Sequence, residues 1–431
     1  MTDGVTDEGQ QEPDDPDGKT TAIELTPPVA GADPGARAGE AAEPERPRVL
    51  LLGSGAPGQE LTIALRRLGA EVVVGDEDHG GPAHAVADQS LVLTLGDPAA
   101  LSEAVGRLRP DFVVTATGAV AGQALESLEG TELVPGARAV GLTGAPERLR
   151  RLAADELGLP TAPFWFVGSV GELEAVAAHA GLPLLVKPVA GAPGRGQSVV
   201  TKRHDLEAVW QGIVGKPVGT PAGEGQYRVL AETLVDVDCF VTLLAVSSRG
   251  PIGEQIEFCS PIGHSRAEAD VLECWQPQQL TPAALDAARS IAARIVKALG
   301  GCGVFGVELM VHGDEVYFAD VTACPRESAW VTLRSQRLSA FELQARAILG
   351  LPVDTMMTSP GAARVMSPGA GLPGAGALAH ALGVPESDAR LVGPGSRAGS
   401  WVALATAPDV AAARERAREV AGRAHVPDSG R

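Results

Sequence analysis

Residues 186–197 read VKPVAGAPGRGQ, and this stretch decides the fold. The apolar residues before it predict a strand that ends at Lys187, which holds the ammonium group beside a glycine-rich turn. Glycines let a backbone approach a polyphosphate closely, and fixed cations add attraction. The residues that supply these features are Lys187, Gly191, Gly194, Arg195 and Gly196. The Walker pattern differs because its Gly-Lys-Ser/Thr run enters a helix. The alternative interpretation is a plain hairpin turn between two strands.

A pair of acidic residues, Glu308 and Asp320, forms the second constellation. We expect residues 304–311 and 316–321 to form a hairpin centred on Asp314, which places the two carboxylates opposite each other with Cβ atoms about 5 Å apart. Facing like charges need neutralisation, and Mg²⁺ binds one or two carboxylates together with nucleotide phosphates. The face expected to pack inward carries Val307, Leu309, Val311, Tyr317, Ala319 and Val321. Solvated carboxylates on an exposed hairpin are the alternative.

Three further residues are candidates for a site. Glu232 ends a predicted strand and could accept a hydrogen bond from an adenine amino group, or it could be an ordinary strand-end charge. For His264 we favour a loop residue over a substrate contact, and for Trp275 packing between domains. The five cysteines are widely spaced and lack a CxxC motif, so we expect reduced thiols in the core and a cytoplasmic location.

The sequence before this region predicts a second kind of domain. Gly53, Gly55 and Gly58 follow a short apolar strand and open a helix, which is the context of a dinucleotide-binding loop. Pro57 removes one of the N–H groups that could face a phosphate, so a Rossmann-like scaffold is favoured over a dehydrogenase site. Asp76 is the acidic residue at the end of the next strand. Strands and helices alternate from here to about residue 115, which predicts βαβ units and a parallel sheet.

Composition limits the function classes. The chain has 431 residues, 45% of them hydrophobic, and a net charge of −19. A strongly acidic protein is not expected to bind nucleic acid non-specifically, and no run approaches the roughly 18 apolar residues of a membrane span. Residues 1–46 carry 12 acidic and 3 basic side chains and lack apolar periodicity, so we expect a disordered acidic tail.

Taken together, these motifs resemble the ATP-grasp ligases, and more closely the formate-dependent glycinamide ribonucleotide transformylases. The resemblance runs from Arg48 to Val426 and rests on stretches that include 49–55, 150–157, 186–189, 194–197, CWQPQQ at 274–279 and VFGVEL at 304–309. It implies an α/β ATP-grasp fold with an N-terminal Rossmann-like domain and a small β-rich C-terminal domain. The implied segments are a tail at 1–46, the Rossmann-like domain at 47–145, the ATP-grasp domain at 146–350 with its lid at about 163–228, the C-terminal domain at 351–426 and a tail at 427–431.

The resemblance also implies chemistry. Enzymes of this family use ATP and formate to make formyl phosphate, which the amine of glycinamide ribonucleotide attacks. ATP and Mg²⁺ are the implied cofactors, the partners are small molecules rather than nucleic acid or membrane, and a homodimer is expected. By position, the ATP-binding residues are Lys187, Gly191, Gly194, Arg195, Gly196, Gln197, Glu232, Thr233, Leu234 and Val235. Glu308 and Asp320 would be metal-binding and, with Lys187, catalytic, while Gly55, Glu327 and Arg397 would bind the substrate.

The resemblance is weaker at the substrate end. Several residues that contact substrate or nucleotide in the family are replaced in this chain. The replacing residues are Ala56, Pro57, Gly118, Phe240, Cys324 and Pro394. Each lost charge-assisted contact costs about 1.5–3 kcal/mol, so we expect glycinamide ribonucleotide to be a poor substrate. The alternative is a divergent homologue that acts on another carboxylate and amine, or one that binds ligand without turnover.

Overall fold

A computed structural model describes the chain in several stretches. They are residues 46–118, 120, 122–126, 128, 130–189, 196–214, 228–250, 253–268, 271–366, 371–393 and 399–424. These residues belong to one compact unit, 46–431. Apart from Arg46, the expected acidic tail lies outside the described residues, as does the tail at 427–431.

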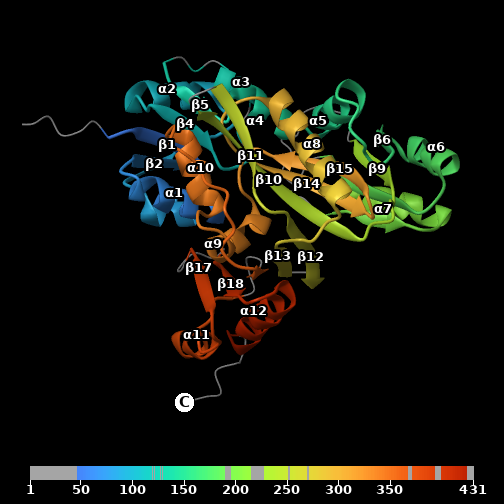
Figure 1. The fold of residues 1–431 in the computed structure, drawn as a ribbon. Helices are drawn as coiled ribbons and strands as arrows, with labels where there is room; N and C mark the ends of the chain where they lie inside the picture. The colour runs from blue at the N-terminus through green and yellow to red at the C-terminus, as the bar shows by residue number, and fades with distance from the viewer. Residues whose placement is uncertain are drawn as a thin grey trace, which may run out of the picture. The chain divides into compact units, whose positions relative to one another are not determined.

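The first part of the unit is built on a parallel sheet (Figure 1). Its strands are β1 (Arg48–Leu52), β2 (Glu71–Asp76), β3 (Gln89–Val92), β4 (Phe112–Thr115) and β5 (Glu132–Val134), in the order β3-β2-β1-β4-β5. The helices are α1 (Ala56–Arg67), α2 (Pro98–Leu108), α3 (Gly122–Glu126) and α4 (Ala137–Thr143), with a short 3-10 helix η1 (Pro82–Val86). Leu50 and Leu51 enter separate buried clusters, as expected of a strand covered on both faces. The Rossmann-like prediction is therefore confirmed.

A smaller antiparallel sheet follows. Helix α5 (Pro146–Arg151) continues into a π-helical turn (Leu152–Glu156). The four strands β6 (Phe164–Val167), β9 (Val229–Thr233), β7 (Leu184–Pro188) and β8 (Ser198–Val200) lie in that order. Helices α6 (Val170–Ala180) and α7 (Leu206–Val214) pack on this sheet through a cluster that includes Leu173 and Trp210. This is the sheet that carries Lys187.

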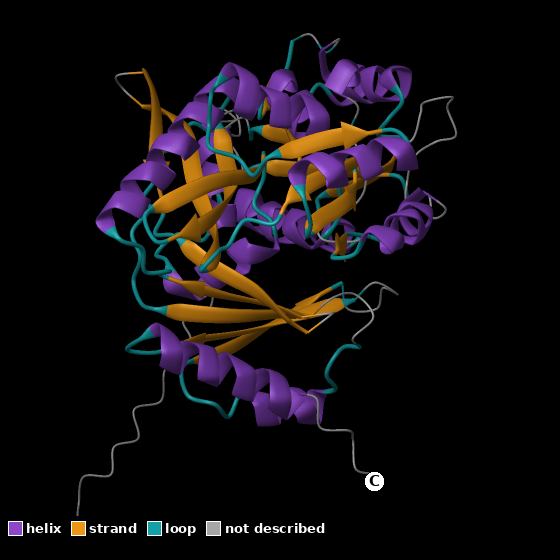
Figure 2. Cartoon of the chain, turned by 90° about the vertical axis from the view of Figure 1, so that its right-hand side faces the viewer, coloured by secondary structure: helices purple, strands orange, loops and turns teal. Residues whose placement is uncertain are grey.

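The third sheet is the largest and is antiparallel. Its order is β15-β14-β10-β12-β13-β16-β18-β17, with β11 paired to β10. The strands are β10 (Cys239–Gly250), β11 (Gly253–Phe258), β12 (Ile262–Glu268), β13 (Val271–Gln276), β14 (Gly303–His312), β15 (Glu315–Thr322), β16 (Gly361–Met366), β17 (Ser387–Val392) and β18 (Ser400–Thr406). The helices are α8 (Pro282–Leu299), η4 (Glu327–Val331), α9 (Thr332–Ser335), α10 (Ala340–Ile348), α11 (Ala375–Ala381) and α12 (Val410–Ala424). The strands of the C-terminal segment continue this sheet through β13 and β16, and helix α12 covers them (Figure 2).

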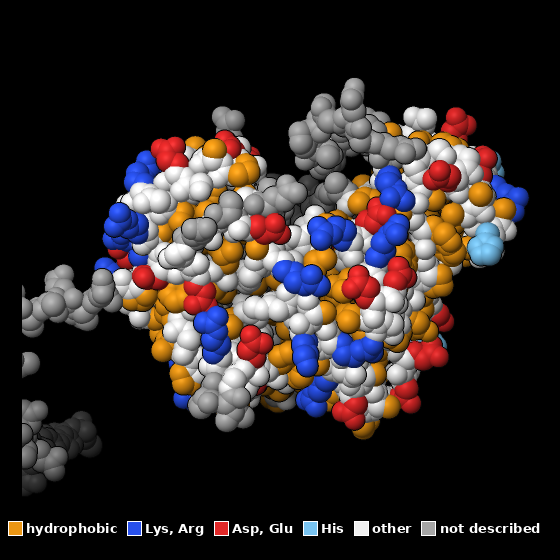
Figure 3. All heavy atoms as spheres, turned by 90° about the horizontal axis from the view of Figure 1, so that it is seen from above, with side chains coloured by type: hydrophobic (Ala, Val, Ile, Leu, Met, Phe, Trp, Pro, Cys, Tyr) orange, Lys and Arg blue, Asp and Glu red, His pale blue; other side chains and the backbone are white. Residues whose placement is uncertain are grey.

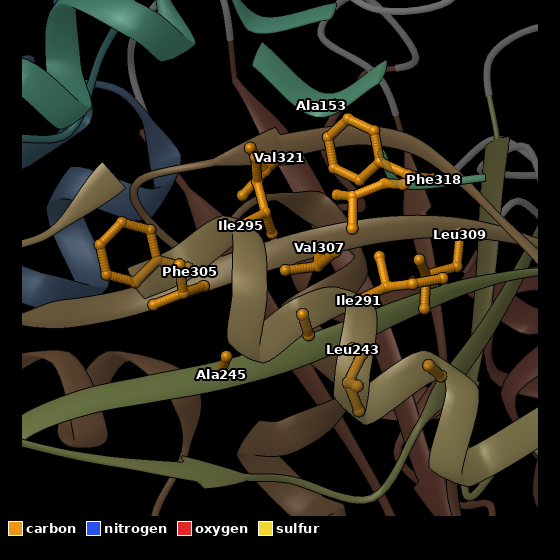
Figure 4. Close-up of a cluster of buried hydrophobic side chains, with 14 of the residues drawn as sticks. Ala153, Leu243, Ala245, Ile291, Ile295, Phe305, Val307, Leu309, Phe318 and Val321 are labelled. Carbon is orange, nitrogen blue, oxygen red and sulfur yellow. The ribbon is translucent and has the colours of Figure 1, made fainter. Parts of the chain in front are cut away.

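The core of the large sheet corrects one prediction about the hairpin. Figure 4 shows Phe318 on the same side as Val307 and Leu309, among the side chains buried beneath α8. Glu308 pairs with Asp320 but Leu309 pairs with Phe318, so Ala319 is a β-bulge that shifts the register by one residue. The prediction that Tyr317 and Ala319 pack inward is therefore wrong, because the bulge turns Val316 and Phe318 into the core instead. The opposition of the two carboxylates is confirmed.

Two surface properties bear on the excluded function classes. On the face seen in Figure 3, acidic side chains are interspersed among the basic ones. Among the described residues, no helix combines the length and hydropathy that crossing a membrane requires.

Candidate active site

Lys187, in the stretch 186–197, forms an ion pair with a buried carboxylate. Its Nζ lies 2.6 Å from Oε2 of Glu232, and the Lys187 side chain is 30% exposed while that of Glu232 is 7% exposed. The two residues come from adjacent antiparallel strands, β7 and β9, in which Glu232 pairs with Leu185. The ammonium group therefore has a fixed position and keeps one side open to solvent.

Arg150 holds the other oxygen of the same carboxylate, and sequence reasoning assigned it no role. Its Nη2 lies 2.5 Å from Oε1 of Glu232, and its guanidinium carbon lies 5.5 Å from the centre of the Phe164 ring. Its side chain is only 6% exposed. Both oxygens of Glu232 thus contact cations, and its single negative charge is shared between Lys187 and Arg150. The sequence contains several arginines, and no local pattern shows which of them pairs with Glu232.

Glu308 and Asp320 face each other on neighbouring strands at the edge of the large sheet. Burial raises the pKa of Asp320, and the charge of Glu308 adds to the increase. The backbone N–H of Val321, together with Arg150 and Lys187, acts in the opposite direction without cancelling it. Because Arg150 and Lys187 both influence Asp320, the cations of helix α5 and the small sheet share one electrostatic environment with the carboxylates of the large sheet.

Three residues brace the Glu308 carboxylate. The Thr242 hydroxyl donates a hydrogen bond to Oε1 at 2.8 Å, and Nε2 of His264 lies 2.8 Å from Oε2. Oγ of Ser328 lies 2.9 Å from the Thr242 hydroxyl oxygen. Thr242 is on β10 opposite Glu308, and His264 is on the next strand, β12. The prediction that His264 is a loop residue is wrong, because the strand pair β12–β13 carries it to the carboxylate.

The donor set is suitable for magnesium. Among the described residues, no group of three His, Cys, Asp or Glu side chains is placed to hold a metal ion. Two facing carboxylates are nevertheless sufficient for Mg²⁺, which prefers oxygen ligands and completes its shell with water and nucleotide phosphates. Burial is the main cause of the raised pKa of Asp320, and the repulsion from Glu308 that adds to it is the interaction that such a cation would relieve.

Gly55, one of the expected substrate residues, lies near the carboxyl end of the parallel sheet. Gly55 is exposed at the start of α1, and Ala56 packs beside the cluster that contains Trp330 of η4. Glu327 is the exposed first residue of η4. Arg397 lies outside the described residues, as does Pro394, but Gly393 just before them donates its N–H to Oε1 of Gln59 at 3.3 Å.

Hydrogen bonds to Asp76 hold the glycine-rich loop after β1 in place. Asp76 accepts hydrogen bonds from the backbone N–H and the hydroxyl of Ser54, at 2.6 and 2.5 Å. The carbonyl of Ser54 accepts from the N–H of Ala83. A Cβ at Gly58 would lie 2.5 Å from the carbonyl oxygen of Gly53, so this glycine is required by close packing. These contacts agree with the scaffold interpretation, since Asp76 supports the loop.

The remaining expected ATP residues are only partly described. Gly191, Gly194 and Arg195 lie outside the described residues. Gly196 has a positive φ of 73°, and Gln197 beside it is exposed. Thr233, Leu234 and Val235 follow Glu232 at the end of β9, and Leu234 is 45% exposed. Phe240 is also exposed, and its ring centre lies 6.3 Å from that of His264.

Comparison with known proteins decides the family. The model of the ATP-grasp domain matches residues 152–341. A formate-dependent phosphoribosylglycinamide formyltransferase from Rhodococcus jostii is 47% identical over 386 residues, which are 87% of this chain and 94% of the relative. One from Burkholderia pseudomallei is 44% identical over 398 residues, or 90% of this chain and 97% of the relative.

The chain belongs to the formate-dependent phosphoribosylglycinamide formyltransferase family.

Solved structures agree with this family. The structure described as glycinamide-RNase-transformylase T from Mycobacterium tuberculosis is 60% identical, covers 87% of this chain and 99% of its own, and superposes with a TM-score of 0.75. N5-carboxyaminoimidazole ribonucleotide synthetase from Thermus thermophilus is 24% identical, covers 89% of this chain and 100% of its own, and has a TM-score of 0.74, which shows a shared fold. The predicted formyltransferase family and α/β ATP-grasp fold are confirmed.

Cysteine chemistry contributes little to this formyltransferase site. The five cysteines are free, and four of them are buried. Burial raises the pKa of Cys259 to about 12 and places the pKa of Cys274 well above its ordinary value. Such thiols are protonated at neutral pH and are poor nucleophiles.

Proposed function

We propose that this protein catalyses the ATP- and formate-dependent formylation of glycinamide ribonucleotide in purine biosynthesis. An oxygen of formate attacks the γ-phosphorus of ATP, so that ADP leaves and formyl phosphate forms. The amine then attacks the formyl carbon, loses a proton and displaces inorganic phosphate. Membership of the family and the retained cation and carboxylate groups support this reaction.

The observation that carries the proposal is the shared environment of Asp320. Glu308 pairs with Asp320 across the strands, and Arg150 of helix α5 donates a hydrogen bond to the Phe318 carbonyl, on the strand of Asp320, at 3.4 Å. Lys187 of the small sheet and Arg150 both act on the charge of Asp320. Phosphoryl transfer depends on fixed cations and metal-binding carboxylates arranged around one phosphate chain. The proximity of both kinds of group supports an ATP site at this position.

Each residue then has a definite task. Lys187 is aimed by Glu232 and would neutralise phosphate oxygens of ATP. Glu308 and Asp320 would hold Mg²⁺, which when bound would offset the negative charge of the phosphates. We propose the remaining ATP contacts at Gly191, Gly194, Arg195, Gly196, Gln197, Glu232, Thr233, Leu234 and Val235, and substrate contacts at Gly55, Glu327 and Arg397.

The proposal also covers the location of the protein and its oligomeric state. A cytoplasmic homodimer is part of the proposal, and free thiols support a reducing compartment. Binding of ATP together with Mg²⁺ is the general requirement of ATP-grasp chemistry, and the facing carboxylates support it here.

The proposal is tested by ADP release in the presence of ATP, Mg²⁺ and formate, with and without glycinamide ribonucleotide. We expect release that depends on both formate and the ribonucleotide. Lys187→Met should lower kcat/KM by about a hundredfold or more, as loss of a preorganised charge does. Lys297→Met, at an exposed position of α8, is the matched control and should leave the rate unchanged.

A second candidate function is formylation, or another acylation, of a different amine. It is supported by Gly118, which has no side chain to orient an amine and which lies beside the guanidinium of Arg326. Formate-dependent ADP release that the ribonucleotide does not stimulate would favour this second candidate. No ADP release with any amine would contradict both.

A further inference from the structure

The indole of Trp275 packs directly on the backbone of β12. A Cβ built on Gly263 would lie 2.4 Å from Cε2 and Nε1 of Trp275 and 2.5 Å from Oε1 of Gln278, which is far inside van der Waals contact. Gly263 has no positive φ, so the neighbouring side chains, and not its backbone conformation, require a glycine here. The indole therefore occupies the space of a side chain on β12, one residue before His264.

Two further residues of the CWQPQQ stretch hold the chain just before β12. Gln276 is fully buried, and its Nε2 donates a hydrogen bond to the carbonyl of Ser260 at 2.7 Å. The backbone N–H of Gln278 donates to the carbonyl of Pro261 at 2.8 Å. The two residues that lead into β12 are therefore both bonded to the stretch that contains Trp275.

The indole of Trp275 is itself held by two contacts. Its Nε1 donates a hydrogen bond to Oε1 of Gln278 at 2.7 Å. The guanidinium carbon of Arg414, on α12, lies 3.9 Å from the ring centre, a distance at which the face of an aromatic ring attracts a cation. Arg414 is paired in turn with the buried carboxylate of Glu273 at 3.1 Å. The ring is thus fixed both at its N–H edge and on one face.

Strand β12 carries His264 to Glu308. Nε2 of His264 lies 2.8 Å from Oε2 of Glu308, which is two strands away on β14. Gly263 pairs with Trp275 across β12 and β13. Successive residues of a strand face opposite sides of the sheet, so the indole lies against β12 on the side opposite to the imidazole. Contact on that side determines how far the strand, and with it the imidazole, extends toward Glu308.

We propose that Trp275 is a positioning residue of the metal site, which holds β12 so that His264 meets Glu308 and orients this carboxylate for Mg²⁺. This inference rests on the proposed function, which gives Glu308 the task of binding Mg²⁺. Trp275 acts through His264 and needs no contact with the nucleotide. The CWQPQQ stretch, to which the proposed reaction assigns no group, thereby acquires a role as the outer support of a metal-binding carboxylate.

Isothermal titration of ATP with and without Mg²⁺ measures this role. Trp275→Phe keeps an aromatic ring but removes the N–H that binds Gln278 and part of the surface that contacts Gly263. We expect binding in the presence of Mg²⁺ to weaken by about three- to tenfold, since a residue that acts through His264 cannot cost more than His264 itself. Binding without Mg²⁺ should not change. Trp401→Phe, at a buried tryptophan of β18, is the matched control, which should lower the melting temperature and leave both affinities unchanged.

A double variant distinguishes positioning from a general effect on the fold. In a His264→Asn background, Trp275→Phe should cause no further loss of affinity with Mg²⁺, because the imidazole through which it acts is gone. Losses that multiply would show that Trp275 acts by another route and would overturn the proposal. An unchanged affinity with Mg²⁺ in Trp275→Phe, or an equal loss with and without Mg²⁺, would also overturn it.

Gly263→Ala tests the same contact from the side of β12. The added methyl group overlaps the indole, so the strand or the ring must shift, and we expect the same selective loss of affinity with Mg²⁺. Gly106→Ala is the control, because Gly106 is exposed on α2 and a Cβ there meets no described atom within 4 Å beyond the helix backbone. A folded Gly263→Ala that binds ATP and Mg²⁺ as the native chain does would contradict the proposal. If Gly263→Ala does not fold, Trp275→Phe and the double variant decide the question.

Nuclear magnetic resonance of the metal-free protein separates this inference from the proposed function. The ring nitrogen resonances of His264, assigned by their absence from His264→Asn, should shift in Trp275→Phe and not in Trp401→Phe, because the contact with Glu308 changes. If they shift but the native protein forms no formylated product, the reaction is wrong and the positioning role stands. If the native protein forms the product but the resonances do not shift, the positioning role is wrong and the reaction stands.

Discussion

Nε2 of His264 lies 2.8 Å from Oε2 of Glu308, so that an imidazole on β12 supports a carboxylate two strands away on β14. Thr242 on the intervening strand β10 supports the other oxygen. The proposed metal ligand is therefore braced on both of its oxygens by neighbours in the sheet. Groups that orient a metal-binding carboxylate are commonly as important as the ligand itself.

His264→Asn should weaken binding of ATP in the presence of Mg²⁺ by about tenfold, as loss of an outer-shell partner does. Binding of ATP without Mg²⁺ should not change, because His264 contacts the carboxylate and not the lysine. Isothermal titration with and without Mg²⁺ measures both. His380→Asn, at an exposed histidine of α11, is the control. An equal loss of affinity in both titrations would assign His264 a direct contact with the nucleotide.

Asp320→Asn should leave the metal-free protein as stable as the native chain, or more stable by about 1–2 °C in melting temperature. Burial and the charge of Glu308 raise the pKa of Asp320, so its ionised form destabilises the fold at neutral pH. In the native protein this penalty disappears as the pH falls through the raised pKa. The advantage of the variant should therefore be present at neutral pH and shrink under acidic conditions. Differential scanning calorimetry without metal gives the comparison, and a strongly destabilised variant would show a structural role.

Glu232→Gln should destabilise the fold by about 3–5 kcal/mol, since removing one partner of a buried ion pair leaves an uncompensated charge. That charge is Arg150, whose side chain is 6% exposed. Glu147→Gln is the matched control, because Glu147 also contacts two arginines, Arg151 and Arg228, but in exposed positions. Its cost should be below about 1 kcal/mol. Urea denaturation compares the two variants, and equal costs would show that the Glu232 cluster is effectively solvated.

Glu273 provides a test of stability against pH. It is buried on β13 and lies 3.1 Å from nitrogen atoms of both Arg414 and Arg418 on α12. Burial acts to raise its pKa, but the hydrogen bonds from the two arginines outweigh burial and lower the pKa below its ordinary value. A lowered carboxyl pKa contributes stability above the unfolded pKa, and this stability is lost as the pH falls through the folded pKa.

Glu273→Gln should therefore cost about 2 kcal/mol at neutral pH and progressively less under acidic conditions, where the native carboxylate is protonated. Urea denaturation at several pH values measures the difference. The side chain of Trp275 provides an internal reporter, because the guanidinium carbon of Arg414 lies 3.9 Å from its ring centre. A cost that does not vary with pH would mean that packing of α12, and not the charge of Glu273, holds this helix.

Much of the architecture could be predicted from local sequence. The apolar run at 49–52 is buried as a parallel strand, and the spacing of Glu308 and Asp320 places them opposite each other. Both features depend on strand periodicity, which is a local property of the chain. The motifs around Lys187 and Glu308 indicate an ATP-grasp protein, and further contiguous stretches, among them CWQPQQ at 274–279, indicate the formyltransferase family.

Only the tertiary structure decided which groups complete the site. Arg150 and Glu232 are 82 positions apart, and His264 and Glu308 are 44 apart, so no local pattern pairs them. The bulge at Ala319 was equally hidden, since one extra residue changes the register of a hairpin without altering its composition. The sequence by itself determined the family, the strands that carry Lys187, Glu308 and Asp320, and the facing carboxylates. Long-range packing of three sheets determined which cations, hydroxyls and imidazole surround them, because contacts between distant segments depend on the fold as a whole.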